Sequence, residues 1–480
     1  MPAVELMAYL PIVLVAATAV SVMFGIAWRR EHTVTVAVTV LGLMLALIAQ
    51  LLIWQSIPVH VPLLDFDGLS LLAGVLILGS TLACAILSHG YLASFRGARE
   101  EFYILLLCAA AGAMVLAASR HMASLFIGLE LLSMPLYGML AYAFHEERSL
   151  EAGIKYLILS AAASAFLLFG MALFYAQTGE LQIDVLMASM DRNTGAWGLA
   201  GMSLMLVGLG FKLSIVPFHM WTPDVYEGGP GPASAFLATA SKVAIFAILL
   251  RIMLSMPVTD GQWLRSVLTL LALASMIIGN LLALTQSNLK RILGYSSIAH
   301  FGYLLIVLVV ADGLAAETGG LYLITYVFST LAAFGVVILV SNTAGGEDAA
   351  ALHYYRGLFW RRPYLTAVLT VSMLSLAGIP ATVGFIGKFY LIALGVESQH
   401  WWLVGGILFG SAIGLYYYLR VTITLFLVQP GMRRRDASDD WGMRAGGLVV
   451  LGIAGLIILW GIYPTPMIEF ARTLSGIAIR

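Results

Sequence analysis

Five ionisable side chains lie inside long apolar stretches of the sequence. Three are lysines, Lys212, Lys242 and Lys388, in a chain that has only five lysines. The others are Glu130, in LFIGLELLSMPLYG, and His300, in YSSIAHFGY. A charge inside a membrane costs at least about 2.5–3.5 kcal/mol on insertion scales. Several such groups in one chain therefore indicate that they have a functional role.

Proton transfer is the chemistry that these groups support. A carboxylate close to a buried lysine keeps the lysine charged, and the lysine loses that support when the carboxylate moves away. Imidazole exchanges protons near neutral pH, so His300 is a candidate relay between lysines. Two other interpretations remain open: a structural ion pair between Glu130 and one lysine, with the other lysines lining water pockets, and an ordinary hydrogen-bonded histidine in the core.

Depth along the expected helices ranks the candidates. At about 1.5 Å per residue, Lys242 lies about 16 Å into its helix, Lys388 about 12 Å from the end of its own, and Glu130 about 14 Å deep. Lys155 is only about 8 Å into its helix. Lys155 is therefore expected to matter less than the three deep lysines: it either snorkels to the interface or takes a less certain place in the proton path.

The elements that must position these residues are membrane-spanning helices. Of the 480 residues, 61% are hydrophobic and 10% are charged, with a net charge of zero. This composition argues against nucleic-acid binding and predicts an all-α integral membrane protein, with residues 1–480 in one polytopic domain. Spans are expected at about 6–27, 33–54, 68–92, 101–118, 121–144, 151–177, 197–226, 231–254, 263–285, 290–311, 315–341, 363–396, 401–428 and 442–463, which makes about fourteen helices.

Two of the expected helices are interrupted by proline near a lysine. Pro217 follows Lys212 by five residues, and Pro380 precedes Lys388 by eight. Proline breaks a helix, and broken helices in the two halves of a transporter mark its ion site. The breaks fall five spans apart, an odd number, which predicts two inverted repeats. These repeats are expected at approximately 101–254 and 263–428.

Basic residues are distributed unevenly between the expected loops. Alternate loops hold 16 basic residues on one side and 6 on the other, with Lys290 and Arg251 counted among the residues at span ends. The positive-inside rule places the richer side in the cytoplasm and both termini outside. Two further features are interpreted as belonging to the surface: Gly345 to Asp348 as a solvated loop, and Trp221 as part of an interfacial belt of tryptophans.

Motifs for redox cofactors and metals are absent from the sequence. Cys84 and Cys108 form no CxxC pair, and GFIGK at 384–388 lacks the upstream glycine and the following Ser or Thr of a phosphate loop. The sequence therefore predicts that this chain contributes no metal ligand and no cofactor-binding residue.

Several stretches resemble the subunit N family of bacterial NADH-quinone oxidoreductase, respiratory complex I. They are FKLSIVPFHMWTPDVYEGGPGPASAFLATASKVAIFAILLR, IGLELLSMPLYGMLAY, SLEAGIKYLILSAAASAFLLFGMAL, LKRILGYSSIAHFGY and LAGIPATVGFIGKFYL, and the resemblance covers essentially the whole chain. It implies fourteen helices in two inverted five-helix repeats, each with a discontinuous helix, and one proton channel that couples NADH-driven quinone reduction to proton pumping. By matching position, Glu130 and Lys212 would be the coupled pair, Lys242 the connecting lysine and Lys388 the terminal one.

The resemblance also implies the surroundings of the chain. NAD, FMN, iron-sulfur clusters and quinone would belong to partner subunits, and the chain would contact a sibling antiporter-like subunit and small membrane subunits in the bacterial inner membrane. The alternative is a subunit of a multisubunit sodium/proton antiporter. One deep carboxylate among three lysines is a poor sodium site, because hard cations prefer several oxygen ligands. A purely structural scaffold is the third interpretation, and it would tolerate Lys→Met changes at the deep positions.

Overall fold

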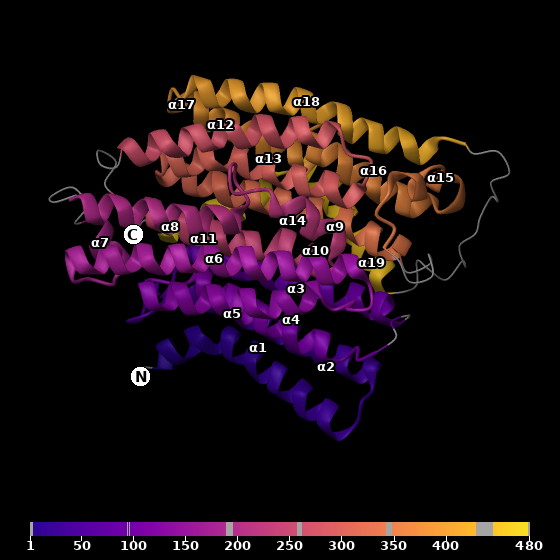
Figure 1. The fold of residues 1–480 in the computed structure, drawn as a ribbon, viewed down its shortest axis with the longest axis horizontal. Helices are drawn as coiled ribbons and strands as arrows, with labels where there is room; N and C mark the ends of the chain where they lie inside the picture. The colour runs from indigo at the N-terminus through magenta and orange to yellow at the C-terminus, as the bar shows by residue number, and fades with distance from the viewer. Residues whose placement is uncertain are drawn as a thin grey trace.

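Helices run side by side through almost all of the part of the chain that the structure describes (Figure 1). The structure is a computed structural model, and it describes residues 3–93, 95, 97–188, 195–256, 262–341, 348–428 and 445–478. The long helices are α1 (Ala3–Trp28), α2 (His32–Leu52), α3 (Gly68–Ala93), α4 (Glu101–Ala117), α5 (Met122–Leu140), α6 (Glu147–Thr178), α8 (Ala196–Leu213), α11 (Lys242–Leu254), α12 (Gln262–Leu284), α13 (Leu289–Val310), α14 (Gly313–Ser341), α16 (Pro363–Ala377), α17 (Val383–Glu397), α18 (Trp401–Phe426) and α19 (Ala445–Ile462).

Shorter elements connect or extend these helices. They are α7 (Ile183–Ala188), α9 (Trp221–Gly228), α10 (Gly231–Phe236), α15 (Leu358–Arg361), α20 (Thr465–Ala478), 3-10 turns at Ile53–Ser56 and Leu352–Tyr355, and a π-helical turn at Leu237–Ser241. Strands β1 (Val59–His60) and β2 (Asp65–Phe66) form one small antiparallel pair, with Val59 opposite Phe66.

The membrane-spanning all-α class expected from the sequence is confirmed. Twelve described helices are long and apolar enough to cross a membrane, and two shorter apolar helices, Glu101–Ala117 and Pro363–Ala377, accompany them. Helix α10, the π-helical turn and α11 form one of the twelve, Gly231–Leu254. Helix α20 follows the last expected span and was not anticipated; it packs against α3 and α14.

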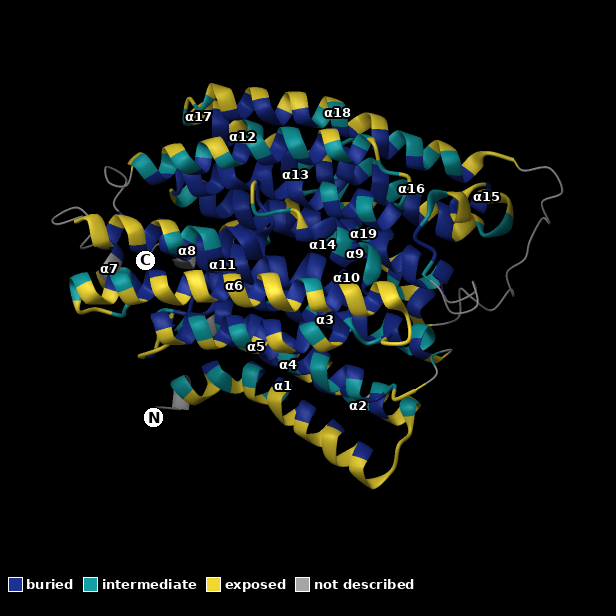
Figure 2. Ribbon diagram, in the orientation of Figure 1, coloured by how far each residue is buried: buried dark blue, intermediate teal, exposed yellow. Residues whose placement is uncertain are grey.

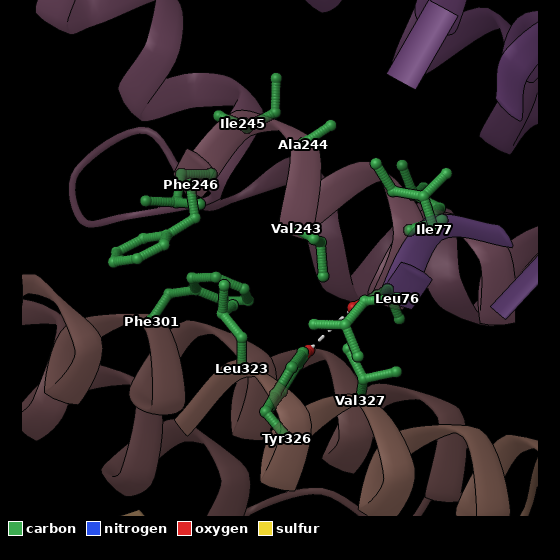
Figure 3. Packing of buried hydrophobic residues seen from close by; sticks show 14 of the residues in the cluster. Leu76, Ile77, Val243, Ala244, Ile245, Phe246, Phe301, Leu323, Tyr326 and Val327 are labelled. Carbon is green, nitrogen blue, oxygen red and sulfur yellow. Dashed lines mark hydrogen bonds between the residues drawn. The ribbon is translucent and has the colours of Figure 1, made fainter. Parts of the chain in front are cut away.

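The most deeply buried helices lie in the middle of the bundle. Nearly every residue of α11, α13 and α14 is buried, whereas α1, α2, α6, α18 and α19 expose many apolar side chains (Figure 2). Exposed apolar side chains suit helices that face hydrocarbon. Inside the bundle, Ile77 of α3, Val243 of α11, Phe301 of α13 and Val327 of α14 belong to one continuous apolar core (Figure 3).

Two spans are broken at the places where proline predicts a break. Helix α8 ends at Leu213, Ser214 has φ +64°, and α9 begins only at Trp221. Helix α16 ends before Gly378, which has φ +82°, and α17 begins at Val383. Left-handed backbone ends a helix, and the carbonyls of the last turn are then free to bind other groups.

Glycines bring α6 and α8 close together. A Cβ atom added to Gly170 of α6 would lie 2.6 Å from the carbonyl oxygen of Gly201, and one added to Gly201 would lie 2.8 Å from that of Gly170. Only glycine permits so close an approach of two backbones, as is usual where membrane helices cross. This crossing holds α8, and with it Lys212, against α6.

Candidate functional site

Polar side chains on α5 and α6 face each other as two stripes. The stripe on α5 consists of Glu130, Ser133 and Tyr137, and the stripe on α6 consists of Tyr156, Ser160 and Ser164. Spacings of three or four residues place the members of each stripe on one helix face. Ser164 Oγ donates to Glu130 Oε1 at 2.6 Å, and the Tyr137 hydroxyl pairs with Ser160 Oγ at 2.8 Å. Hydrogen bonds therefore join the two stripes.

Lys212, near the end of α8, inserts its amine between the two stripes. It is 4% exposed, and its Nζ donates to Ser133 Oγ at 2.5 Å and to Ser160 Oγ at 2.6 Å. Glu130 and Lys212 form no ion pair: the carboxylate accepts from Ser164, one helical turn from Ser160. The expected pair is thus brought into one neighbourhood, where the two groups bind serines one helical turn apart on α6.

Lys242, the first residue of α11, is completely buried beside the break between α8 and α9. Its Nζ donates to the backbone oxygen of Lys212 at 3.2 Å and also bonds Ser214 Oγ. The same nitrogen lies 5.2 Å from the ring centre of Trp221 and 5.6 Å from that of Phe301. Two of the predicted lysines are therefore in direct contact, side chain to backbone.

The interpretation of Trp221 as an interfacial residue is wrong. Trp221 is 3% exposed, donates from Nε1 to the Phe211 oxygen at 3.1 Å, and lies against Lys242. Its position at the end of an apolar stretch indicated an interface, but the break folds this end of the span into the protein. Aromatic rings beside a buried amine stabilise its charged form.

His300, in the middle of α13, has hydroxyl partners on both ring nitrogens. Nδ1 pairs with the Tyr322 hydroxyl at 2.7 Å and Nε2 with the Tyr418 hydroxyl at 3.1 Å, and Tyr418 in turn pairs with Ser296. A phenol can donate or accept a hydrogen bond, so either tautomer of the imidazole is accommodated. The arrangement suits a relay and suits a satisfied core histidine equally well.

Among the described residues, the polar chain is interrupted between Lys242 and His300, and again between His300 and Lys388. No hydrogen bond joins Lys242 to His300; the neighbouring side chain, Phe301, presents its ring to the Lys242 amine instead. A proton passing between these residues would need at least one water molecule at this point.

Lys388, on α17, is held by the second break. Its Nζ donates to the oxygen of Ala377, the last residue of α16, at 2.8 Å, and lies 5.4 Å from the ring centre of Tyr303. Tyr303 accepts from Asn280 Nδ2 at 2.8 Å. In both breaks, a carbonyl at the end of the first helical segment accepts from a buried lysine.

Lys155 lies apart from this chain, at the rim of a polar cavity of about 280 Å³. Its side chain is 40% exposed, and Nζ contacts Glu151 Oε1 at 2.7 Å and Asp224 Oδ2 at 3.0 Å. Arg291 holds the other oxygen of Asp224 at 2.7 Å. Burial raises the pKa of the Asp224 carboxyl, but hydrogen bonds from Lys155 and Arg291 outweigh burial and hold the pKa below its usual value. Lys155 thus joins a salt-bridge network and does not reach the deep lysines.

Two basic residues that the sequence placed at span ends are buried. Lys290 is 0% exposed and contacts Gly229 O at 2.6 Å and Asp348 Oδ2 at 2.5 Å. Asp348 is therefore not solvated, contrary to expectation; residues 345–347 lie outside the described residues. Arg251 makes a double contact with Asp67, at 2.8 and 2.9 Å. Position along a helix gives no information on the neighbouring segment that covers its end.

The hydroxyl groups are what sequence reasoning missed. Ser133 and Ser160 are almost completely buried, and their spacing from Glu130 and Tyr156 would have placed them on the polar faces of their helices. Serine occurs throughout membrane helices, so this signal becomes specific only when Lys212 is seen to bind both. Among the residues that the structure describes, no group of three or more His, Cys, Asp or Glu side chains could hold a metal ion.

Comparisons with known proteins agree along the length of the chain. A family model described as "NADH:quinone oxidoreductase/Mrp antiporter, TM" matches residues 119–414. The NADH-quinone oxidoreductase subunit N of Chromohalobacter salexigens is 65% identical over 470 residues, which are 98% of each chain. The protein of the same name from Ectopseudomonas mendocina is 56% identical over 481 residues, covering 99% of this chain and 97% of the relative.

Solved structures give the same arrangement of helices. A chain of respiratory complex I from Thermus thermophilus, solved with bound aureothin, is 34% identical to this chain, with a TM-score of 0.82. The match covers 96% of this chain and 99% of the Thermus chain. A chain of the archaeal membrane-bound sulfane sulfur reductase complex is 24% identical with a TM-score of 0.88, and the match covers 98% of both chains. A chain of the Mrp complex of Dietzia sp. is 20% identical with a TM-score of 0.85, and the match covers 98% of this chain and 97% of the Mrp chain. At these lower identities the likeness concerns the fold alone.

Proposed function

The chain belongs to the subunit N family of NADH-quinone oxidoreductase, and from this premise we propose that protons cross it by way of Glu130, Lys212, Lys242, His300 and Lys388. It is a proton-translocating membrane subunit of respiratory complex I, and it serves a translocase that couples electron transfer from NADH to quinone to proton pumping. The redox chemistry belongs to other subunits of that complex.

The observation that carries the proposed path is the helix break that anchors the Lys242 amine beside Lys212. The Lys212 amine binds the serines of α5 and α6, while its backbone oxygen accepts from the Lys242 amine at 3.2 Å. Both lysines are buried in the same region, and like charges in a medium of low dielectric constant disfavour each other, so a proton on one lysine favours release of the proton from the other. A deep pair of lysines at a helix break is therefore suited to passing a proton onward.

Glu130 sets the direction of transfer in this proposal. When its carboxylate is near, Lys212 keeps its proton. When the carboxylate moves away, an N–H bond of Lys212 breaks, water carries the proton, and a new N–H bond forms on the neutral Lys242 amine. From Lys242 the proton crosses the gap beside Phe301 through water and reaches His300 and then Lys388. The hydroxyl partners of His300 accept either tautomer during this passage.

The surroundings of the chain are part of the same proposal. NAD, FMN, iron-sulfur clusters and quinone bind to partner subunits, and this chain lies beside a sibling antiporter-like subunit and small membrane subunits in the bacterial inner membrane. The end of the bundle with more basic residues faces the cytoplasm, and both termini face outward. The N and C labels lie at the same end of the bundle in Figure 1, which supports a common side for the two termini. Residues 101–254 and 263–428 are proposed as the two inverted repeats.

The sodium/proton antiporter alternative is less well supported. Its support is the fold it shares with the Mrp complex, whereas 65% and 56% identity over almost the whole chain favour complex I. The polar chain also offers lysines and hydroxyl groups in place of the clustered oxygen ligands that sodium would need.

Replacing the first two groups of the path tests the proposal. Glu130→Ala and Lys212→Ala should each reduce NADH-driven quinone reduction and proton uptake in membrane vesicles by more than tenfold, because a blocked path stalls the redox reaction coupled to it. Arg29→Ala, which changes a basic residue with a 74% exposed side chain, is the control and should leave both rates unchanged. The content of assembled complex should remain normal in all three. Unchanged rates and pumping in Lys212→Ala would refute the path.

A further inference from the structure

We propose that Ser160 is a positioning residue for Lys212: together with Ser133 it holds the amine away from Glu130, so that the carboxylate acts on the lysine without touching it. This inference rests on the proposed function and assigns a role within it. The Lys212 amine takes Ser133 and Ser160 as partners, at 2.5 and 2.6 Å, although a carboxylate lies on the same helix face as Ser133.

The two serines present different hydroxyl groups to the lysine. Ser133 donates its own proton to the Leu129 oxygen at 2.7 Å, one turn earlier in α5, so it can only accept from Lys212. Ser160 makes no bond to its own helix; its other partner is the Tyr137 hydroxyl at 2.8 Å. The Ser160 hydroxyl is therefore free to turn, accepting from an ammonium or donating to a neutral amine.

Ser164 binds Glu130 one helical turn beyond Ser160. Its Oγ bonds the carboxylate at 2.6 Å, again without a bond to its own helix, and it follows Ser160 by four residues on α6. Many other serines in these helices bond the carbonyl four residues earlier, as Ser372 does with Val368 at 2.8 Å. A pair of unattached hydroxyls one turn apart, with Glu130 on one and Lys212 on the other, is thus a specific arrangement.

Separation of the two charges has a functional reason. The attraction between opposite charges grows steeply at short distance in a medium of low dielectric constant, so a direct Glu130–Lys212 contact would keep the lysine charged through the whole cycle. Neutral hydroxyl partners satisfy the amine in both of its protonation states. Small movements of Glu130 can then decide whether Lys212 holds its proton.

Removing a single hydroxyl tests this role. In assembled complex, Ser160→Ala should lower NADH-driven quinone reduction and proton uptake about tenfold, the lower end of the effect of one hydrogen bond to a charged group. Ser160→Thr keeps the hydroxyl and should retain most of the activity. Ser372→Ala is the matched control, because Ser372 is equally buried and bonds only its own helix; its rates should be unchanged.

Combining variants separates positioning from packing. If Ser160 acts by keeping Lys212 from Glu130, Ser160→Ala should cost much less in a Glu130→Gln complex than in the unmodified one. A Thr variant as slow as the Ala variant, at normal complex content, would show that side-chain volume is responsible and would overturn the inference. So would losses that simply multiply in the double variant.

Failure of this inference can be told apart from failure of the proton path. An inactive Lys212→Ala complex with a fully active Ser160→Ala complex would overturn the role of Ser160 alone, whereas an active Lys212→Ala complex would overturn the path itself. If Ser160→Ala lowers the content of complex, Ser160→Cys replaces it with the same expectations, since a thiol is similar in size and a much weaker hydrogen-bond partner.

Discussion

Asp67 and Arg251 form a buried ion pair whose removal should be costly. Arg251, in the last turn of α11, and Asp67, immediately before α3, contact each other through two hydrogen bonds of 2.8 and 2.9 Å, with side chains 9% and 11% exposed. Asp67→Asn is the informative change. Asp67 Oδ1 also accepts from the backbone nitrogen of Ser70 at 2.9 Å, and asparagine caps a helix as well as aspartate does. The variant therefore removes the charge and keeps the cap.

The expected cost follows from the contacts that remain. Removing one partner of a buried ion pair destabilises a protein by about 3–5 kcal/mol, because the other charge stays buried. Asp65 Oδ2 lies 3.6 Å from Arg251 and the new amide oxygen can still accept one hydrogen bond, so the cost should fall at the lower end, about 3 kcal/mol.

Stability of the assembled complex is the quantity to measure. Membranes carrying Asp67→Asn should contain less intact complex, and their NADH-driven quinone reduction should decay faster on heating. Adding Arg251→Gln should recover part of the loss, because no uncompensated charge then remains buried. Wild-type content and an unchanged rate of heat inactivation in Asp67→Asn would show that the pair contributes nothing and would refute this reasoning.

Two further outcomes are expected. Lys155→Ala should retain clearly more quinone reduction than Lys212→Ala, because the Lys155 amine is partly exposed and Arg291 still holds Asp224 in its absence; equal inactivity of the two variants would contradict this. Burial raises the pKa of Asp67, but the charge and hydrogen bonds of Arg251 outweigh burial and hold that pKa below its usual value. The ion pair therefore stabilises the fold fully above about pH 4, and this stabilisation is lost as the pH falls through the lowered pKa. Acid inactivation below about pH 4 should therefore be less steep in Asp67→Asn than in the wild type, and identical profiles would contradict it.

The spans and their breaks were predictable from the sequence for a physical reason. A helix that crosses hydrocarbon must be apolar over about 20 residues, and proline removes a helix donor, so local sequence favours the breaks after Lys212 and before Lys388. Proline alone is not sufficient, because α1 and α5 continue through Pro11 and Pro135. Both breaks are found where they were expected. The burial of the three deep lysines follows from the same argument.

Partnerships between segments were not predictable in this way. The contacts of Lys290 with Asp348 and of Arg251 with Asp67 join residues 58 and 184 positions apart, and a single sequence carries no signal for them. The serines around Lys212 were missed because a serine in an apolar helix usually bonds its own backbone. Ser160 binds the lysine only because α8 packs beside α6 in the folded chain.

The two helix breaks bear on the direction of proton flow. Each offers a lysine a backbone oxygen, that of Lys212 for Lys242 and that of Ala377 for Lys388. A carbonyl oxygen has no proton to give and does not keep one, so it anchors an amine without ever exchanging with it. These contacts therefore position the amines, and a proton must reach or leave each lysine by another route. In the proposed path, a proton on Lys388, whose only hydrogen bond among the described residues goes to the Ala377 oxygen, can leave only when water reaches the amine. Access of water to that position would then control release of the proton.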